Sequence, residues 1–230
     1  MKNETNMTNL IKLENVSRTF GANSRETLVL DSISLEAVRG ELLLLLGPSG
    51  SGKTTLLTLI AGLIKPTSGK VSLFDKDISQ YSYQELQAIR AKHIGFIFQT
   101  FKLIDSFTVE ENITIVGRFA GLRDKESKDR TDQLLNQLKI NHLAKKLPSQ
   151  LSQGEKQRTA IARATLVNTD IIIADEPTAS LEANQGYQII ELLHHYAEEQ
   201  NKLVIVASHD LRLKKFTNKI MYIENGKMLN

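Results

Sequence analysis

Cysteine is absent from this sequence, and its absence removes several kinds of chemistry at once. The chain can form no disulfide, build no thiolate metal site and use no cysteine nucleophile. No apolar run approaches the roughly 18 residues of a membrane span. Met1 to Asn9 is polar and lacks the apolar core of a signal peptide. We therefore expect a cytoplasmic chain that reaches the inner face of a membrane only through a partner.

A strong excess of one charge is also lacking. The chain has 29 Lys and Arg against 26 Asp and Glu, which gives a net charge of +3. The basic residues are scattered among carboxylates and form no long block, so we predict no nucleic-acid partner. A length of 230 residues fits one α/β domain, or a core with a small inserted subdomain.

Short aliphatic runs predict the core of the fold. They lie at Leu42 to Leu46, Ile171 to Ala174 and Leu203 to Ala207, with a weaker run at Lys219 to Ile223. Runs this continuous suit strands buried on both faces, as in a parallel sheet. Three earlier segments mix polar and apolar residues, as antiparallel strands with one wet face do: Leu10 to Val16, Thr27 to Ala37 and Lys70 to Phe74. We expect an α/β fold with an antiparallel β layer beside a parallel core.

The middle of the chain has helical periodicity. Between about 83 and 146, one apolar stripe is formed by Leu134, Leu135, Leu138 and Leu143. The charged run from Arg123 to Arg130 is typical of a solvated helix start. With the helix expected after residue 152, we predict an inserted α-helical subdomain over about 83–165, within a single domain spanning 1–230.

A glycine-rich loop follows the leucine run and leads directly into an apolar helix. Its residues are Gly47, Pro48, Ser49, Gly50, Ser51, Gly52, Lys53 and Thr54. Glycines allow successive backbone N–H groups to converge on an anion, and the helix N-terminus adds a partial positive charge. The pattern predicts a phosphate cradle in which Lys53 reaches the β and γ phosphates and Thr54 ligates Mg²⁺. The alternative is a Gly/Ser turn between a core strand and a helix. The specified positions of the motif should match by chance in only about one in a hundred such chains.

Two adjacent carboxylates follow the aliphatic run that begins at Ile171. Asp175 and Glu176 lie at the C-terminal edge expected for a parallel strand, where ligands bind. Beside the phosphate cradle, Asp175 would hold Mg²⁺ and Glu176 would polarise the attacking water. The alternative is an acidic loop opening before Pro177. The cradle favours the catalytic interpretation.

A second glycine-bearing helix start lies at Leu151 to Glu155. Ser152 and Glu155 have the spacing of a capping box, and Gly154 stands between them. The chain thus has two helix N-termini suited to phosphate but only one phosphate cradle to hold a nucleotide. A second anion site far along the sequence suggests that it serves the nucleotide of another protomer.

These motifs together resemble the ATPase subunits of ATP-binding cassette (ABC) transporters, from Leu10 to the C-terminus. Gly47 to Thr54 matches the Walker A loop, with Thr55 beside it, and Ile171 to Glu176 matches the Walker B strand. Leu151 to Glu155 resembles the signature loop, and Pro177 to Glu182 the D-loop region. Three single residues resemble the adenine-stacking aromatic, the Q-loop glutamine and the switch histidine of the family: Phe20, Gln99 and His209.

The resemblance implies a P-loop NTPase with a RecA-like core that binds and hydrolyses ATP with Mg²⁺. Two such chains, as a homodimer or a paired ATPase, would close head to tail around two ATP molecules. Each ATP would then lie between one chain's Walker A loop and the Ser152 and Gly154 of the other. Lys53, Glu176 and His209 would serve hydrolysis, and Gln99 would join Thr54 and Asp175 at Mg²⁺. Closure and reopening would drive a membrane permease.

Three residues depart from the family pattern. Gln153 stands where the signature usually has Gly, Glu155 where it has Gln, and Glu182 where the D-loop has Asp. These changes put the efficiency of hydrolysis in doubt but leave ATP binding intact. They leave open a different class of function, an ATP-dependent scaffold or switch with low turnover. A DNA-repair or translation ATPase is disfavoured, since those carry insertions that 230 residues cannot hold.

The segments Ile97 to Ile104 and Ala174 to Thr178 resemble the lipoprotein-releasing and macrolide-exporter ATPases of bacteria. That subfamily handles lipoproteins, peptides or drugs, so an exporter is expected, although the substrate path lies in another chain. We predict that Phe101, Leu103 and Ile104 help form the groove that accepts the permease. The alternative is that they are core residues of the helical subdomain. His194 and His195 match no family motif and are interpreted as helix-surface residues.

Overall fold

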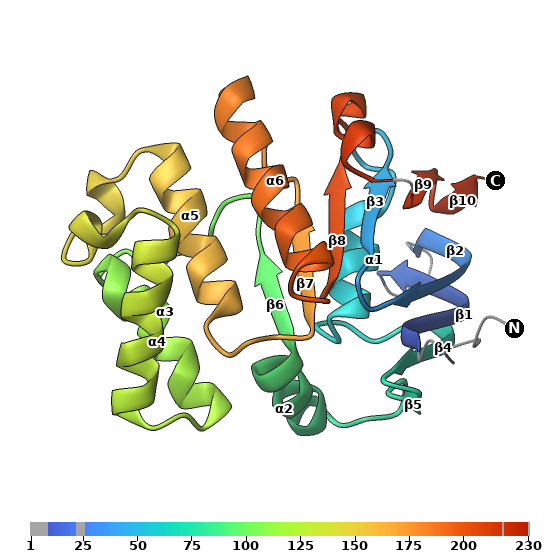
Figure 1. Ribbon diagram of the computed structural model, residues 1–230. Coiled ribbons are helices and arrows are strands. Elements are labelled where there is room, and N and C mark those ends of the chain that lie inside the picture. Colours follow the sequence, from blue (N-terminus) through green and yellow to red (C-terminus); the bar gives the residue numbers. More distant parts are fainter. Residues whose placement is uncertain (1–8, 22–25, 218, 230) are drawn as a thin grey trace, which may run out of the picture.

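The structure is a computed structural model that describes residues 9–21, 26–217 and 219–229. Its centre is a six-stranded sheet in the order β10-β9-β3-β8-β7-β6 (Figure 1). All neighbouring pairs are parallel except β10 with β9. The strands are β3 (Leu42–Leu46), β6 (Ile94–Ile97), β7 (Ile171–Asp175), β8 (Leu203–Ser208), β9 (Lys219–Glu224) and β10 (Lys227–Leu229).

The leucine run shows why this sheet is buried on both faces. In an extended strand, successive side chains point to opposite sides. Leu43 and Leu45 accordingly join one hydrophobic cluster, while Leu42, Leu44 and Leu46 join another. The first cluster fills the space beneath the antiparallel layer and around α1 (Lys53–Ile60), and the second lies beneath α6 (Ala183–Glu198). The predicted parallel core is therefore confirmed.

The antiparallel layer is a four-stranded sheet in the order β2-β1-β4-β5. Its strands are β1 (Asn9–Phe20), β2 (Thr27–Val38), β4 (Ser68–Leu73) and β5 (Lys76–Asp77). In β2, Ile33, Leu35 and Ala37 are buried while Ser34 and Glu36 between them are exposed. This alternation is the predicted single wet face. The strand bounds differ from those predicted by up to four residues at an end.

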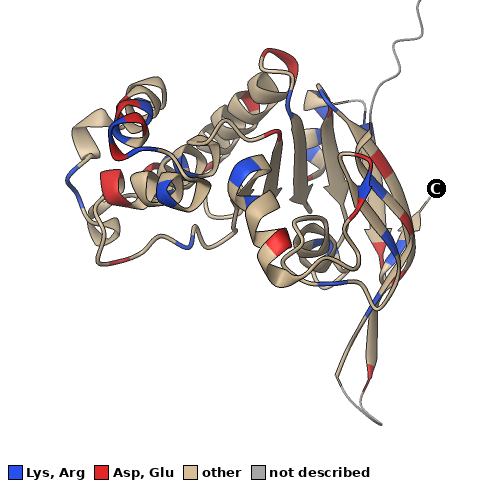
Figure 2. Cartoon of the chain, turned by 90° about the horizontal axis from the view of Figure 1, so that it is seen from below, with Lys and Arg blue, Asp and Glu red and all other residues tan. Residues whose placement is uncertain are grey.

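The remaining helices are α2 (Tyr83–His93), α3 (Val109–Ala120), α4 (Asp124–Gln137) and α5 (Gln153–Thr165). Short 3₁₀ turns cover Asn141–Leu143, Pro148–Gln150 and Leu211–Phe216. In Figure 1, α3, α4 and the start of α5 form a lobe to one side of the sheets. The charged run forms the start of α4, and Figure 2 shows both signs of charge on the helices of this lobe.

One part of the predicted helical subdomain, 83–165, is not helical. β6 lies inside that range and pairs with β7 as the last strand of the parallel sheet. Its Gly95 faces α5, where an added Cβ would lie 2.1 Å from the carbonyl oxygen of Ala164. Residues 98–107 are also outside any helix. The compact helical lobe therefore begins at α3.

Two smaller features also bear on function. His194 contacts Glu198 one turn later on α6, at 3.2 Å, and His195 is exposed, so both are helix-surface residues as expected. Among the described residues, no helix combines the length and apolar character needed to cross a membrane. Of the predicted polar tail, residues 1–8 lie outside the described residues, and Asn9 begins β1.

Candidate nucleotide site

The predicted cradle lies at the C-terminal edge of β3 and runs into α1. Gly50 and Gly52 have φ angles of +80° and +105°, in the left-handed region that favours glycine. Gly47 is required for a different reason. A Cβ at this position would lie 2.2 Å from the carbonyl oxygen of Ile223 and 2.7 Å from Ser51 Oγ. The backbone of the loop at Gly47 therefore packs directly against β9, with no room for a side chain.

We expect Gly47→Ala to lower the free energy of unfolding by about 1–3 kcal/mol and to weaken ATP binding, because the methyl group must displace the loop from Ile223. Thermal unfolding and fluorescent-nucleotide binding measure the two effects. Gly121→Ala is the control for loss of a glycine away from the loop. Unlike Gly47, Gly121 has a positive φ, +81°, so the methyl group strains the backbone there too, but no atom of the described residues lies within 4 Å of an added Cβ, so ATP binding should be retained. Full ATP affinity in Gly47→Ala would contradict the tight fit.

Lys53 lies within the loop. Its ammonium donates to the carbonyl oxygens of Gly47, at 2.8 Å, and Pro48, at 3.0 Å. It also lies 3.5 Å from Glu176 Oε1, and its side chain is only 7% exposed. Loop carbonyls and a carboxylate therefore hold this cation above the loop.

Thr54 and Asp175 join the cradle to the acid strand. The Thr54 hydroxyl donates to Asp175 Oδ2 at 2.8 Å. Asp175 Oδ1 is buried and has no hydrogen-bond partner among the residues that the structure describes. Burial raises the pKa of the Asp175 carboxyl, and the Thr54 hydroxyl opposes the shift. A buried carboxylate oxygen without a partner, beside a hydroxyl, fits an Mg²⁺ site completed by phosphate oxygens.

Glu176 is at the centre of a small polar network. Its Oε2 lies 3.0 Å from His209 Nδ1 and 3.5 Å from Ser208 Oγ. The backbone of Glu176 has a φ of 49°, and its N–H donates to the carbonyl of Ala207 at 2.9 Å. This turn brings the carboxylate back over the end of β8, toward Lys53 and His209.

The motif reasoning missed one member of this network. Ser208 ends β8, contacts Glu176 and accepts a hydrogen bond from the N–H of Asp210 at 3.0 Å. Its position as the last residue of a buried strand, directly before His209, was the available signal. Asp210 caps the following 3₁₀ turn, as its side chain accepts from the N–H of Arg212.

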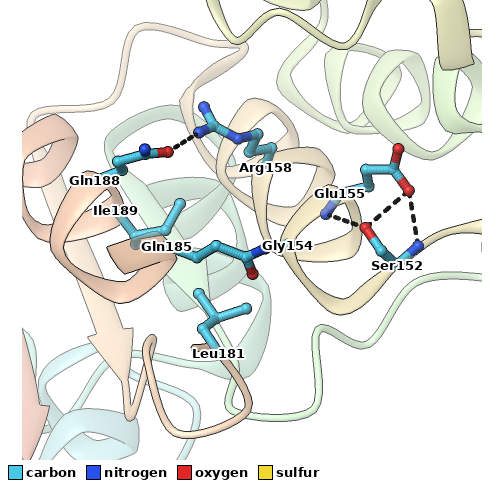
Figure 3. A pocket seen from close by; sticks show the side chains of 8 residues that line it. All are labelled: Ser152, Gly154, Glu155, Arg158, Leu181, Gln185, Gln188 and Ile189. Atoms are coloured by element: carbon cyan, nitrogen blue, oxygen red, sulfur yellow. Dashed lines mark hydrogen bonds between the residues drawn. The ribbon is translucent and has the colours of Figure 1, made fainter. Parts of the chain in front are cut away.

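The second helix start has the predicted capping box. The Ser152 N–H and hydroxyl donate to Glu155 Oε2 at 2.7 and 2.9 Å, and Ser152 Oγ accepts from the N–H of Glu155 (Figure 3). The hydrogen bonds from Ser152 lower the pKa of the Glu155 carboxyl. A cleft of about 160 Å³ lies between this helix start and α6. It is lined in part by Gly154, Arg158, Gln185 and Gln188.

The other predicted binding residues lie apart from this network. Gln99 is exposed, two residues beyond β6 at the same sheet edge as Asp175. Phe20, 39% exposed at the end of β1, has the Arg18 guanidinium 4.5 Å from its ring centroid. Thr55 lies in the first turn of α1. Among the described residues, no hydrogen bond links Gln99, Phe20 or Ser152 to the cradle. Of the predicted residues, direct polar contacts join Thr54 to Asp175, and Lys53 and His209 to Glu176.

A glycine loop between a parallel strand and a helix, with a strand of the same sheet that ends in an acid hydrogen-bonded to Thr54, defines the class of P-loop nucleotide hydrolases. Within that class, residues 30–179 match the family model described as ABC transporter. The chain belongs to the ABC transporter family, as an ATP-binding and ATP-hydrolysing subunit.

Relatives support this assignment along nearly the whole chain. The putative hemin import ATP-binding protein HrtA of Staphylococcus haemolyticus is 38% identical over 95% of this chain and 98% of its own. HrtA of Staphylococcus aureus strain Newman is 40% identical over 94% and 97%.

Solved structures agree with the fold. The dimeric structure of MJ0796, a bacterial ABC transporter cassette, has a TM-score of 0.90 and 36% identity over 96% of this chain and 97% of its own. A structure of the same cassette in a post-hydrolysis state, bound to ADP and Pi, has a TM-score of 0.89 and 35% identity over 96% and 98%. The predicted fold class is therefore confirmed, and the subfamily resemblance is consistent with these relatives.

Proposed function

We propose that this chain drives a membrane permease by closing in pairs around two ATP molecules. One observation carries the proposal: the two helix starts suited to phosphate are separated within one chain. The cleft at Ser152 and Gly154 includes no residue of the Gly47 to Thr54 loop, and α5 begins in the lobe, away from α1, in Figure 1. The MJ0796 dimer supports pairing of such cassettes. The second helix start is then available to the nucleotide of a second copy.

In this proposal the residues around Glu176 carry the chemistry. Glu176 accepts a proton from the attacking water. The water oxygen bonds to the γ-phosphorus while the bond between the γ-phosphorus and the ADP oxygen breaks. Lys53 leaves the loop carbonyls for the phosphate oxygens, and His209 donates toward the γ-phosphate. Mg²⁺, held by Thr54 and Asp175 with Gln99 close by, would neutralise phosphate charge. Phe20 would stack on adenine.

The signature departures support a low-turnover switch as the second candidate. The Glu155 carboxylate holds both the N–H and the hydroxyl of Ser152, and it brings a negative charge beside the proposed phosphate position. Steady-state ATP hydrolysis with and without the membrane partner separates the candidates. Strong stimulation by the partner supports a transport motor, and hydrolysis that stays low in both conditions supports the switch.

An apolar groove of about 380 Å³ is the proposed permease site. It lies where α5, β6 and α3 meet, and its lining includes Leu63, Phe98 and Phe119. The residues predicted from the sequence, Phe101, Leu103 and Ile104, do not line it. Ile104 is 42% exposed; its backbone N–H donates to Asn112 Oδ1 at 2.7 Å, and its carbonyl accepts from Asn112 Nδ2 at 3.1 Å. We propose an apolar helix of the permease as the occupant, because Phe119 is 68% exposed on an ATPase of a transporter family.

We expect Phe119→Glu to reduce permease co-purification about tenfold or more, since a carboxylate in an apolar contact must be desolvated. Pull-down from cells that express both proteins measures the effect. Leu211→Glu is the control, because Leu211 is similarly exposed, 60%, but lies outside the groove. Equal recovery of the permease with both variants would remove the groove from the interface.

The permease, which contains the substrate path, sets the cargo and the direction of transport. Export of a lipoprotein, peptide or drug remains a prediction, whereas the Staphylococcus relatives carry a name that specifies hemin import. We therefore add hemin as a candidate cargo. ATP hydrolysis by the cassette and its permease in vesicles, with hemin or a lipopeptide on either side, tests cargo and direction together. In the proposed complex the chain lies at the inner face of the cell membrane.

A further inference from the structure

One arginine of α5 holds the turn that contains Gln99. Arg163 Nη1 donates to the carbonyl of Lys102 at 2.5 Å, and Nη2 donates to the carbonyl of Phe101 at 2.6 Å. Arg163 is half-buried, which lowers its pKa. It has no carboxylate partner among the described ion pairs. Its charge is directed at two backbone carbonyls instead.

The turn itself has an unfavourable backbone conformation. Phe101 and Lys102 have φ angles of 58° and 51°, the left-handed region that residues with a Cβ rarely adopt in succession. Its internal bonds run from Phe101 N–H to Phe98 O, at 3.0 Å, and from Lys102 N–H to Thr100 O, at 2.6 Å. A planar guanidinium can bind two adjacent carbonyls at once, whereas a lysine ammonium offers a single point charge.

The same end of α5 also holds the strand before Gln99. At Gly95 in β6 there is no room for a side chain against the Ala164 carbonyl, so helix and strand meet backbone to backbone. Arg163 further lines the apolar groove. The opposite end of this helix, about 20 Å away by helix geometry, carries the Ser152 capping box. One short segment therefore contacts the Gln99 turn, β6 and the groove.

We propose that Arg163 is the positioning residue for Gln99. Gln99 is exposed, and its side chain makes no hydrogen bond to any described residue, so its location depends on the backbone that Arg163 holds. This inference rests on the proposed function, in which Gln99 serves the Mg²⁺-nucleotide site. It assigns Arg163 a role in coupling the groove, the helical lobe and the nucleotide site.

Hydrogen–deuterium exchange of the full chain tests the structural step without nucleotide or permease. In Arg163→Gln, we expect the amides of Phe101 and Lys102 to exchange about tenfold faster or more, since two charge-assisted hydrogen bonds are lost. Arg163→Lys should give an intermediate rate. Arg130→Gln is the control, because Arg130 also donates to a backbone carbonyl, that of Leu166, but touches neither the turn nor the groove. Unchanged exchange in both Arg163 variants would overturn the proposal.

A double-mutant cycle on Mg²⁺ dependence tests whether Arg163 acts through Gln99. Gln99→Ala and Arg163→Gln should each raise the Mg²⁺ concentration for half-maximal hydrolysis severalfold, while ATP affinity stays constant. The double variant should be no worse than Gln99→Ala. Additive effects would overturn the positioning role. If Gln99→Ala alone changes nothing, the proposed function of Gln99 fails, and the exchange rates still decide whether Arg163 holds the turn.

Discussion

Glu176→Gln should bind ATP with wild-type affinity and hydrolyse it about a hundredfold to ten-thousandfold more slowly, the range expected for loss of a general base. The amide keeps the size of the side chain but cannot take the proton of the attacking water. ATP should then accumulate between two chains. Light scattering should show a dimer with ATP and a monomer with ADP.

The network around Glu176 explains why this substitution should spare the fold. His209 and Lys53 approach the carboxylate from different sides, at 3.0 and 3.5 Å, and an amide oxygen still accepts from either group. Glu198→Gln is the matched control, because Glu198 pairs with a histidine on the surface of α6, away from the nucleotide. Hydrolysis by Glu176→Gln at near the wild-type rate would assign the base to another residue.

Gly154→Asp should weaken ATP-dependent dimer formation about tenfold or more, because of one misplaced charge. The monomer should still fold and bind ATP. Of the described part of the chain, only the amide end of Gln185 lies near an added Cβ, at 3.1 Å, and this exposed side chain can move. The new carboxylate would instead meet the phosphate of the partner's nucleotide. Dimer formation is best measured by light scattering in the Glu176→Gln background.

Glu155, one residue later, provides a control that should change dimer affinity in the opposite direction. Glu155→Gln removes a negative charge from the same helix start but keeps an oxygen that can cap Ser152. We expect this variant to dimerise more tightly than the parent. If Gly154→Asp dimerises normally while Glu155→Gln shows no gain, the second helix start does not meet the partner's nucleotide.

Features that depend on consecutive residues were predictable. The phosphate loop, the acid strand and the capping box each lie within a short segment whose geometry follows from its own backbone, as Gly52 and the Ser152 box show. β6 was less predictable. Its four residues are too few to show a period, and its place in the sheet is decided by pairing with β7, about 75 residues later in the chain.

The groove shows the same limit at the level of side chains. The sequence places Phe98 and Phe101 three residues apart, yet only Phe98 lines the groove. The left-handed turn held by Arg163 sets the direction of these side chains, and Arg163 is 62 residues from Phe101. No local pattern in the sequence indicates that contact.

The sequence by itself determined the glycine loop and the pair of acids, and it predicted that they bind a nucleotide phosphate, because backbone freedom and charge are properties of short segments. Only the tertiary structure decided which side chains meet. Thr54 reaches Asp175, and Lys53 reaches Glu176, across more than 120 residues of chain. These contacts, and the separation of the cradle from the second helix start, follow from the packing of parallel strands against helices, which no local segment encodes.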